Sequence, residues 1–257
     1  MTVHDVQNEI DRRGVEIDEV GIDGLRYPVT FNDGRVRQSG IAEVAVTVRL
    51  PHDRRGTHMS RMIELAHAHL QRFDPREFPR VLKAGADLLD VDAVVIKVAI
   101  PVGTLVTAPA SGADSWQVHD VTVEGRIDRG VTSVVTEVTT EVTSLCPCSK
   151  TISDYGAHNQ RSRVTLAVSG EGDDPYPLPM GEIVDLLRAC GSAPIMPLVK
   201  RPDERVLTME AYDHPLFVED MARDVSVACR ERGIVHLVTV RNLESIHSHD
   251  AIARVSG

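Results

Sequence analysis

Long stretches in which apolar and polar residues alternate are the feature that most constrains the fold of this chain. From Gly40 to Leu50 every second residue is apolar, and Glu43, Thr47 and Arg49 stand between them. The same period runs through 131–145. A period of two is that of a β-strand with one buried face. The sequence therefore predicts long strands that each cover one side of a core.

Helical periodicity lies between these strands, and the order of elements indicates the fold class. Strands are predicted at 25–31, 40–50, 93–102, 115–126, 131–145, 162–169 and 234–240, the last with an extension toward 249. Helices are predicted over 57–73, 78–90, 179–190 and 218–232, and loops over 107–114 and 193–215. Each half then reads strand, strand, helix, helix, strand, strand. Hairpin pairs with helices grouped between them predict an α+β fold with antiparallel sheets and helices on one face.

This order also predicts the division of the chain. We expect an N-terminal segment at 1–38, a first module at 39–128, and a second module at 129–257 that carries most of the chemically interesting residues. A four-stranded sheet leaves open edges, which favours further strand pairing between subunits.

Composition and charge exclude several classes of protein. The chain has 257 residues, 42% hydrophobic and 26% charged, as in ordinary soluble proteins. Its net charge of −10 argues against a nucleic-acid or membrane binder. No apolar stretch approaches the ~18 residues of a membrane span, and the N-terminus lacks the order of a signal peptide. We therefore expect a cytoplasmic protein.

The four cysteines agree with that location, because they are too few for a disulfide-built scaffold of this size. Cys190 and Cys229 each fall near the end of a helical pattern and are predicted to be buried as small apolar residues.

The polar connection 144–162 carries the other two cysteines. Cys146 and Cys148 flank Pro147, and His158 follows. Thiolate and imidazole are the ligands that a zinc-class metal selects. Because no second ligand pair stands at short spacing, a closed structural site is disfavoured and an open, catalytic coordination is favoured. A turn with an incidental thiol and a surface histidine is the alternative reading.

Two charged segments downstream offer further ligands. In the segment KRPDE, Glu204 could complete a metal site, and Lys200 and Arg201 could face phosphate; a solvated charged loop is the alternative. Glu219 opens the last predicted helix, where the helix dipole favours an acid for structural reasons alone. Its carboxylate could equally accept two N–H groups from a guanine-type edge.

Histidines and arginines form two more candidate groups. His247 and His249 lie two residues apart, so on a strand both rings would point to the same side and could relay protons. A histidine-rich tail without function is the alternative. Arg54, Arg55, His58 and Arg61 surround a predicted helix start, which suits either a polyphosphate dock or a subunit interface.

Five segments in order resemble those of GTP cyclohydrolases of type IB: RGTHMSR, LCPCSKTISDYGAHNQRS, KRPDE, AYDHPLFVED and ESIHSHD, spread from about residue 54 to 250. The resemblance implies the tunnelling fold (T-fold), with two tandem ββααββ modules per chain. It implies a homo-oligomer, expected to be a tetramer, with active sites at subunit interfaces. The implied reaction converts GTP and water to 7,8-dihydroneopterin triphosphate and formate, at the entry to tetrahydrofolate synthesis. One divalent metal per site (zinc, manganese or ferrous iron) and no nucleotide cofactor are implied.

The resemblance also implies residue roles, position by position. Cys146, His158 and Glu204 resemble the metal ligands, and Glu219 resembles the acid that anchors the purine. Cys148, His247 and His249 resemble catalytic or site-lining groups, and Glu244 joins the residues around the substrate. The cations expected to hold the triphosphate are Lys150, Arg161, Lys200 and Arg201, with Arg54, Arg55 and Arg61 from a neighbouring subunit.

Three other readings stay open at this point. An archaeal-type relative stops at a cyclic phosphate of dihydroneopterin and uses ferrous iron. The nitrile reductase of queuosine synthesis, another T-fold enzyme, uses a cysteine nucleophile and NADPH, but no nicotinamide fingerprint is evident here. A T-fold protein that binds purines or pterins without catalysis is the third.

Overall fold

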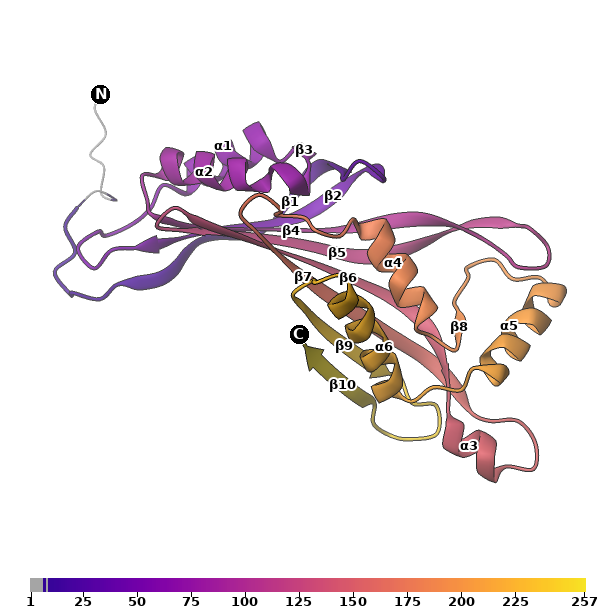
Figure 1. Ribbon diagram of the computed structural model, residues 1–257. Coiled ribbons are helices and arrows are strands. Elements are labelled where there is room, and N and C mark those ends of the chain that lie inside the picture. Colours follow the sequence, from indigo (N-terminus) through magenta and orange to yellow (C-terminus); the bar gives the residue numbers. More distant parts are fainter. Residues whose placement is uncertain (1–6, 8) are drawn as a thin grey trace. The chain divides into compact units, whose positions relative to one another are not determined.

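A computed structural model describes residue 7 and residues 9–257 and shows a mixed α+β protein (Figure 1). Residues 1–6 and 8 of the predicted N-terminal segment lie outside the described residues. The chain divides into two compact units. Unit 1 runs to Ile100 and includes Thr122–Thr136 and Gly170–Tyr176, and unit 2 comprises Pro101–Val121, Glu137–Ser169 and Pro177–Gly257. Within the described residues, no helix is long and apolar enough to span a membrane.

Unit 1 is built on long antiparallel strands. Its strand order is β4-β2-β1-β3, in which β1 (Ile17–Asn32), β2 (Arg37–Leu50) and β4 (Ala93–Thr107) pair antiparallel and the short β3 (Arg72–Phe73) joins β1 in parallel. Helices α1 (Met59–His69) and α2 (Phe78–Leu89) contact each other on one side of these strands, and the 3-10 turn η2 (Pro75–Glu77) precedes α2 (Figure 1).

The core of unit 1 confirms the alternation predicted for 40–50. Val44, Val46 and Val48 on β2 are buried, and they face inward together. Three buried phenylalanines fill the space beneath the helices: the ring centroids of Phe31 and Phe73 lie 6.3 Å apart, and those of Phe73 and Phe78 lie 5.1 Å apart. Aromatic pairs at these separations add to the stabilisation from burial alone.

Strand β1 is longer than predicted, since it begins at Ile17 rather than Leu25. The first half of β1 contains no buried residue, and its pairing with β2 slips twice, between Ile17 and Val20 and between Ile22 and Leu25. A stretch of strand with neither face buried shows no alternation of apolar and polar residues, so the sequence pattern could not reveal it.

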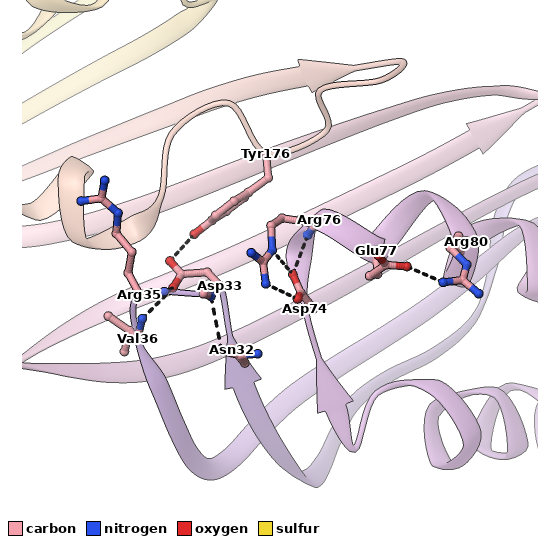
Figure 2. A network of polar contacts seen from close by, with 10 residues as sticks. Asn32, Asp33, Arg35, Val36, Asp74, Arg76, Glu77, Arg80 and Tyr176 are labelled. Carbon is pink, nitrogen blue, oxygen red and sulfur yellow. Dashed lines mark hydrogen bonds and ion pairs between the residues drawn. The ribbon is translucent and has the colours of Figure 1, made fainter.

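A buried carboxylate holds the turn between β1 and β2 (Figure 2). Asp33 accepts hydrogen bonds from the backbone N–H groups of Arg35 (3.0 Å) and Val36 (2.8 Å) and from the hydroxyl of Tyr176 (3.0 Å). Gly34 has a φ of +88°, which an L side chain rarely adopts. Tyr176 therefore joins the segment 170–176 to the hairpin within unit 1.

Unit 2 has the strand order β10-β9-β7-β6-β5-β4, with a further short strand on β6. Its elements are β5 (Asp114–Asp128), β6 (Val131–Leu145), α3 (Pro147–Ile152), β7 (Asn159–Glu171), α4 (Met180–Ala189), β8 (Ala193–Pro194), α5 (Arg201–Asp213), α6 (Val218–Glu231), β9 (His236–Asn242) and β10 (Ala251–Ser256). Strands β4, β5 and β6 pass through both units. Helix α6 contacts β9 and β10, and buries Met221, Val225 and Cys229 (Figure 1).

Two expectations for unit 2 were wrong. The region 193–215 was predicted as a loop, but Arg201–Asp213 is the helix α5. Only Asp203 and Ala211 of α5 are buried, so the helix has no apolar stripe for the sequence pattern to reveal. The last strand was expected to extend toward 249, but β9 ends at Asn242 and β10 begins at Ala251.

The prediction for the two helical cysteines is confirmed. Cys190 and Cys229 are buried, and both are free thiols. Burial raises the pKa of Cys190 to about 12 and raises that of Cys229 in the same direction. Both thiols are therefore held protonated and inert at neutral pH.

Substitution of Thr136 on β6 is expected to increase the stability of the protein. Thr136 is 2% exposed, and its hydroxyl is the one buried side-chain polar atom without a hydrogen-bond partner among the described residues. Thr136→Val keeps the shape and removes that unpaired group, so we expect stabilisation by about 1 kcal/mol in urea unfolding. Thr140→Val is the matched control. Thr140 is equally buried on the same strand, but its hydroxyl pairs with Nδ1 of His119 at 2.9 Å, so this variant should be less stable than wild type. Equal losses in both variants would contradict the argument.

Candidate active site

Cys146 and His158 are brought together by the backbone at the end of β6. Cys146 caps α3, and its Sγ accepts the N–H of Ser149 at 3.5 Å. The N–H of Cys146 donates to the carbonyl oxygen of His158 at 3.1 Å. Pro147 occupies the first helical position, where a missing N–H does no harm. The predicted polar connection thus folds into a short helix and a loop that returns to its starting point.

The ring of His158 is oriented in a way that suits metal binding. Its Nδ1 lies 3.0 Å from Oε1 of Gln160 and 3.4 Å from the hydroxyl of Ser245. Since an amide oxygen can only accept, Gln160 favours the tautomer with the proton on Nδ1, which leaves the Nε2 lone pair free. A metal-binding histidine commonly donates its other N–H in this way. The donor atoms present, thiol sulfur and imidazole nitrogen, fit a zinc-class ion.

A buried polar layer beneath His158 escaped the sequence analysis. Gln160 and Asn242 each donate to the hydroxyl of Ser144, at 3.3 Å and 3.2 Å, and Ser162 donates to Asn242 at 2.6 Å. Ser144 in turn donates to the carbonyl oxygen of Leu216 at 3.1 Å. Ser144 and Ser162 fall in the buried phase of their strands, so polar residues at apolar positions of the alternation were the available signal.

The two C-terminal histidines lie beside His158. The rings of His247 and His249 stack with centroids 5.3 Å apart, and those of His158 and His247 meet edge to face at 6.5 Å. The expected strand at these positions is wrong, because the segment 243–250 is irregular. Stacking, rather than strand alternation, places both rings together. The start of this segment is fixed by the N–H of Leu243, which donates to the carbonyl oxygen of Arg161 at 2.9 Å.

Other predicted residues are placed with different partners. Lys150 donates to the carbonyl oxygen of Tyr212, and its ammonium lies 4.1 Å from the centre of that ring, so it joins α3 to the end of α5. Arg161 is an exposed side chain that pairs with Glu141 at 3.5 Å. Glu244 lies on the same irregular segment as the histidine pair and is partly exposed. Cys148 is exposed on α3.

Glu219 is not needed to cap its helix. Asp220 accepts the N–H of Phe217 at 3.1 Å and pairs with Arg223 at 3.3 Å. Glu219 is exposed, and its side chain has no hydrogen-bond partner within the described part of the chain. Capping of α6 therefore belongs to Asp220, whereas Glu219 lies in the first turn, where the helix dipole favours an acid, so its role toward a substrate stays a prediction.

Glu204 lies at the start of α5 and is exposed. Among residues 7 and 9–257, no three histidine, cysteine or acidic side chains are grouped closely enough to hold a metal ion. The set of Cys146, His158 and Glu204 is therefore not assembled within the described chain, and it stays a prediction. The same holds for phosphate binding by Lys200 and Arg201, which open this helix.

The arginines of the segment 54–61 belong to unit 1. Arg54 pairs with Asp90 at 3.4 Å, and Arg55 pairs with Glu9. Arg61 forms no ion pair within the described residues. Their contact with a triphosphate bound by a neighbouring subunit stays a prediction.

Asp203 is the residue of the KRPDE segment whose side chain forms the most hydrogen bonds, and the sequence analysis did not single it out. Asp203 is 0% exposed. Its Oδ1 accepts the N–H groups of Ala110 (2.8 Å) and Ser111 (2.7 Å), and its Oδ2 accepts the hydroxyl of Ser111 (2.7 Å) and the N–H of Lys200 (2.9 Å). Burial alone would raise the pKa of Asp203, but these hydrogen bonds hold it well below the usual value. Asp203 thereby fixes the start of α5 to the loop between β4 and β5.

Asp203→Asn is expected to lower the melting temperature, because either amide orientation points an NH₂ group at a backbone N–H. The depressed pKa means that the carboxylate stabilises the fold fully above the ordinary carboxyl pKa and loses that effect as the pH falls below it. Glu204→Gln, the same change one residue on, should leave the melting temperature unchanged and lower turnover instead. A melting curve of Asp203→Asn that matches wild type would contradict the role given to this carboxylate.

Comparisons with known proteins identify the family. The family model described as type I GTP cyclohydrolase folE2 matches residues 3–253. A GTP cyclohydrolase FolE2 of Neisseria meningitidis serogroup A is 40% identical over 99% of this chain and 85% of its own length. A GTP cyclohydrolase FolE2 of Herminiimonas arsenicoxydans is 39% identical over 98% of this chain and 96% of its own length.

The fold has a solved counterpart in a protein of different sequence. The structure of uricase from Arthrobacter globiformis covers 93% of this chain and 92% of its own, with a TM-score of 0.53 and 10% identity, which is a likeness of fold alone. The family, in contrast, follows from the match over nearly the whole sequence: the chain belongs to the type I GTP cyclohydrolases of the FolE2 kind.

Proposed function

We propose that this protein converts GTP and water to 7,8-dihydroneopterin triphosphate and formate, the first step of tetrahydrofolate biosynthesis. Membership of the FolE2 family over residues 3–253 is the observation that carries the proposal. The site chemistry supports it, because Cys146, His158, His247 and His249 gather at one end of unit 2.

A divalent metal is part of this proposal. Cys146 and His158 would hold zinc, manganese or ferrous iron, and Glu204 would be the third ligand. When bound, such an ion polarises a substrate oxygen and lowers the pKa of a water molecule toward 7. Because the described chain joins Cys146 and His158 through their backbones and groups no three candidate ligands, we propose that the site is completed in a homo-oligomer, a tetramer, with active sites at subunit interfaces.

The remaining residues bind the substrate and move protons. Glu219 would accept two N–H groups from the guanine edge remote from C8, which directs C8 toward Cys146 and His158. The stacked pair His247 and His249 would transfer protons as water adds at C8, the imidazole ring opens and formate leaves. Cys148 and Glu244 would line the site. The triphosphate would be held by Lys150, Arg161, Lys200 and Arg201, with Arg54, Arg55 and Arg61 of a neighbouring subunit.

The element order supports two tandem ββααββ modules of the T-fold type. The first would be β1, β2, α1, α2, β4 and β5, and the second would be β6, β7, α4, α6, β9 and β10, with α5 inserted between its helices. We place the N-terminal segment at 1–38 and the modules at 39–128 and 129–257, with β1 of the N-terminal segment adding the first strand to the first module, in a protein of the cytoplasm.

Anaerobic incubation with GTP and one defined divalent metal at a time tests the function. We expect equimolar formate and, after oxidation, a fluorescent pterin that carries the triphosphate. Protein treated with a chelator is the control and should be inactive until metal is restored. A cyclic phosphate product would favour the archaeal-type reaction, and GTP binding without formate would favour a non-catalytic binding protein. Either outcome would overturn the proposal.

A further inference from the structure

Unit 2 contains a pocket lined by none of the residues assigned to the site above. Its volume is about 410 Å³, within the range of small-molecule sites. The end of β4, the end of α4, the segment 194–196 and Glu210 of α5 line it. Its apolar wall consists of Leu105, Val106, Ala189, Pro194, Ile195 and Met196.

A largely buried arginine also lines this pocket. The side chain of Arg188 is 18% exposed. Its Nε and Nη2 donate to Oε1 of Gln117 at 3.1 Å and 2.6 Å, and Nη2 also donates to the hydroxyl of Thr104 at 2.8 Å. These bonds fix the guanidinium plane, because a forked donor held at three points cannot turn.

The hydrogen-bond partners of this guanidinium are neutral. Gln117 and Thr104 carry no charge, and His119, whose Nε2 lies 3.5 Å from Nη2, has its pKa lowered to about 4, first by burial and then by Arg188 itself. Within the described chain the nearest carboxylate is that of Asp185, 3.8 Å from Nη1 and 80% exposed to solvent. Nη1 forms no hydrogen bond within the described residues. A charge withdrawn from water is normally paired with a close counter-ion. The Asp185 carboxylate is too distant and too exposed for that, so the guanidinium of Arg188 has no close, buried counter-ion.

We propose that this pocket binds a small monocarboxylate, whose carboxylate pairs with Arg188 through Nη1 and whose apolar body lies against Leu105, Pro194 and Met196. A carboxylate is one of the anions with which a guanidinium forms strong, charge-assisted hydrogen bonds. Glu210 also lines the pocket and opposes any anion, a doubly charged phosphate more than a monocarboxylate, and Arg188 is the one cation that lines it.

Calorimetric titration of the full-length protein with benzoate tests this site, independently of GTP turnover. We expect saturable binding of one benzoate per chain. The neutral isostere benzamide and inorganic phosphate should each bind at least about tenfold more weakly. Ala189→Trp fills the pocket from the exposed end of α4 without touching the bonds of Arg188, and it should weaken benzoate binding by at least about tenfold.

Two more variants complete the test. Arg188→Lys keeps the charge but loses the bonds to Gln117 and Thr104 that hold Nη1 in place, so benzoate binding should fall while the protein stays folded. Val227→Trp places a tryptophan on the exposed face of α6 as a control and should bind benzoate like wild type. Absence of benzoate binding, equal binding to Ala189→Trp and wild type, or a preference for phosphate would each overturn the proposal.

Discussion

Replacing Cys146 with alanine is expected to remove the bound divalent metal and formate release together. Even the outer partners of a metal ligand contribute about 10–100-fold to affinity or activity, so loss of a direct thiolate ligand should lower turnover by more than about 100-fold. Cys146 sits at the helix cap, where its N–H is bonded to the carbonyl oxygen of His158. Because this backbone contact survives in alanine, the loop should keep its shape, and the loss should report on the sulfur.

The measurement needs metal content and formate on the same samples. Cys148→Ala is the matched control, since its thiol lies two residues away and is exposed on the same short helix. It should retain the metal, whatever it does to the rate. His247→Ala should likewise retain the metal but lose turnover, because its ring lies beside His158 without being assigned as a ligand. If Cys146→Ala lost the metal and still released formate at the wild-type rate, the proposed site would be wrong.

The parts of the fold that could be predicted from the sequence are the strands and helices with one buried face and one solvent-exposed face. The alternation in β2 and β6 marked strands that bury Val44 and Val138, and the stripe of α6 marked a helix that buries Met221 and Val225. Elements exposed on nearly all sides have no periodic apolar pattern in the sequence. The first half of β1 has no buried residue, and α5 buries only Asp203 and Ala211.

The candidate site divides in the same way. Cys146 and His158 share one connection, and a local backbone bond brings them together. Asp203 was missed because its partners Ala110 and Ser111 lie more than 90 positions earlier in the chain, and no local pattern encodes that contact. The grouping of Glu204 with the thiol and the imidazole is not formed within the described residues, and it stays a prediction.

Some long-range contacts did have a sequence signal. Gln117 and His119 occupy the same phase of β5 as the buried Val121 and Val123. A histidine at an apolar position of a strand must either find partners or be neutral. His119 does both, since it bonds to two threonines and stays neutral at pH 7.

Unit 2 is expected to lose stability as the pH falls from about 6.5 toward 4, because His119 must take up a proton inside the core. His119 is 1% exposed, and its pKa is lowered to about 4, by burial first and by Arg188 second. In the unfolded chain the ordinary value near 6.5 applies. Between these values the unfolded state binds more protons than the folded state, so stability decreases as the solution is acidified. The full effect, about 3 kcal/mol, is reached below pH 4.

The hydrogen bonds around His119 explain why protonation is resisted. Nδ1 lies 2.9 Å from the hydroxyl of Thr140, and Nε2 lies 2.8 Å from that of Thr104, which also accepts from Arg188. The tautomer with its proton on Nδ1 satisfies all of these bonds, since Thr104 then donates to Nε2. A second proton on Nε2 would face the hydroxyl hydrogen of Thr104 and the guanidinium of Arg188, 3.5 Å away.

His119→Gln separates this effect from general acid denaturation. Glutamine cannot take up the proton, so the stability of the variant, measured by urea unfolding at pH 7 and at pH 4.5, should fall less between the two than that of wild type. The variant starts from a lower stability at pH 7, because the ring's fit to Thr104 and Thr140 is lost, and the two curves should converge in acid. His69→Gln, at an exposed position of α1, should follow the wild-type curve. Parallel curves for His119→Gln and wild type would mean that the proton enters elsewhere. Convergence would instead identify a buried neutral imidazole as the group that couples the packing of β4, β5 and β6 to pH.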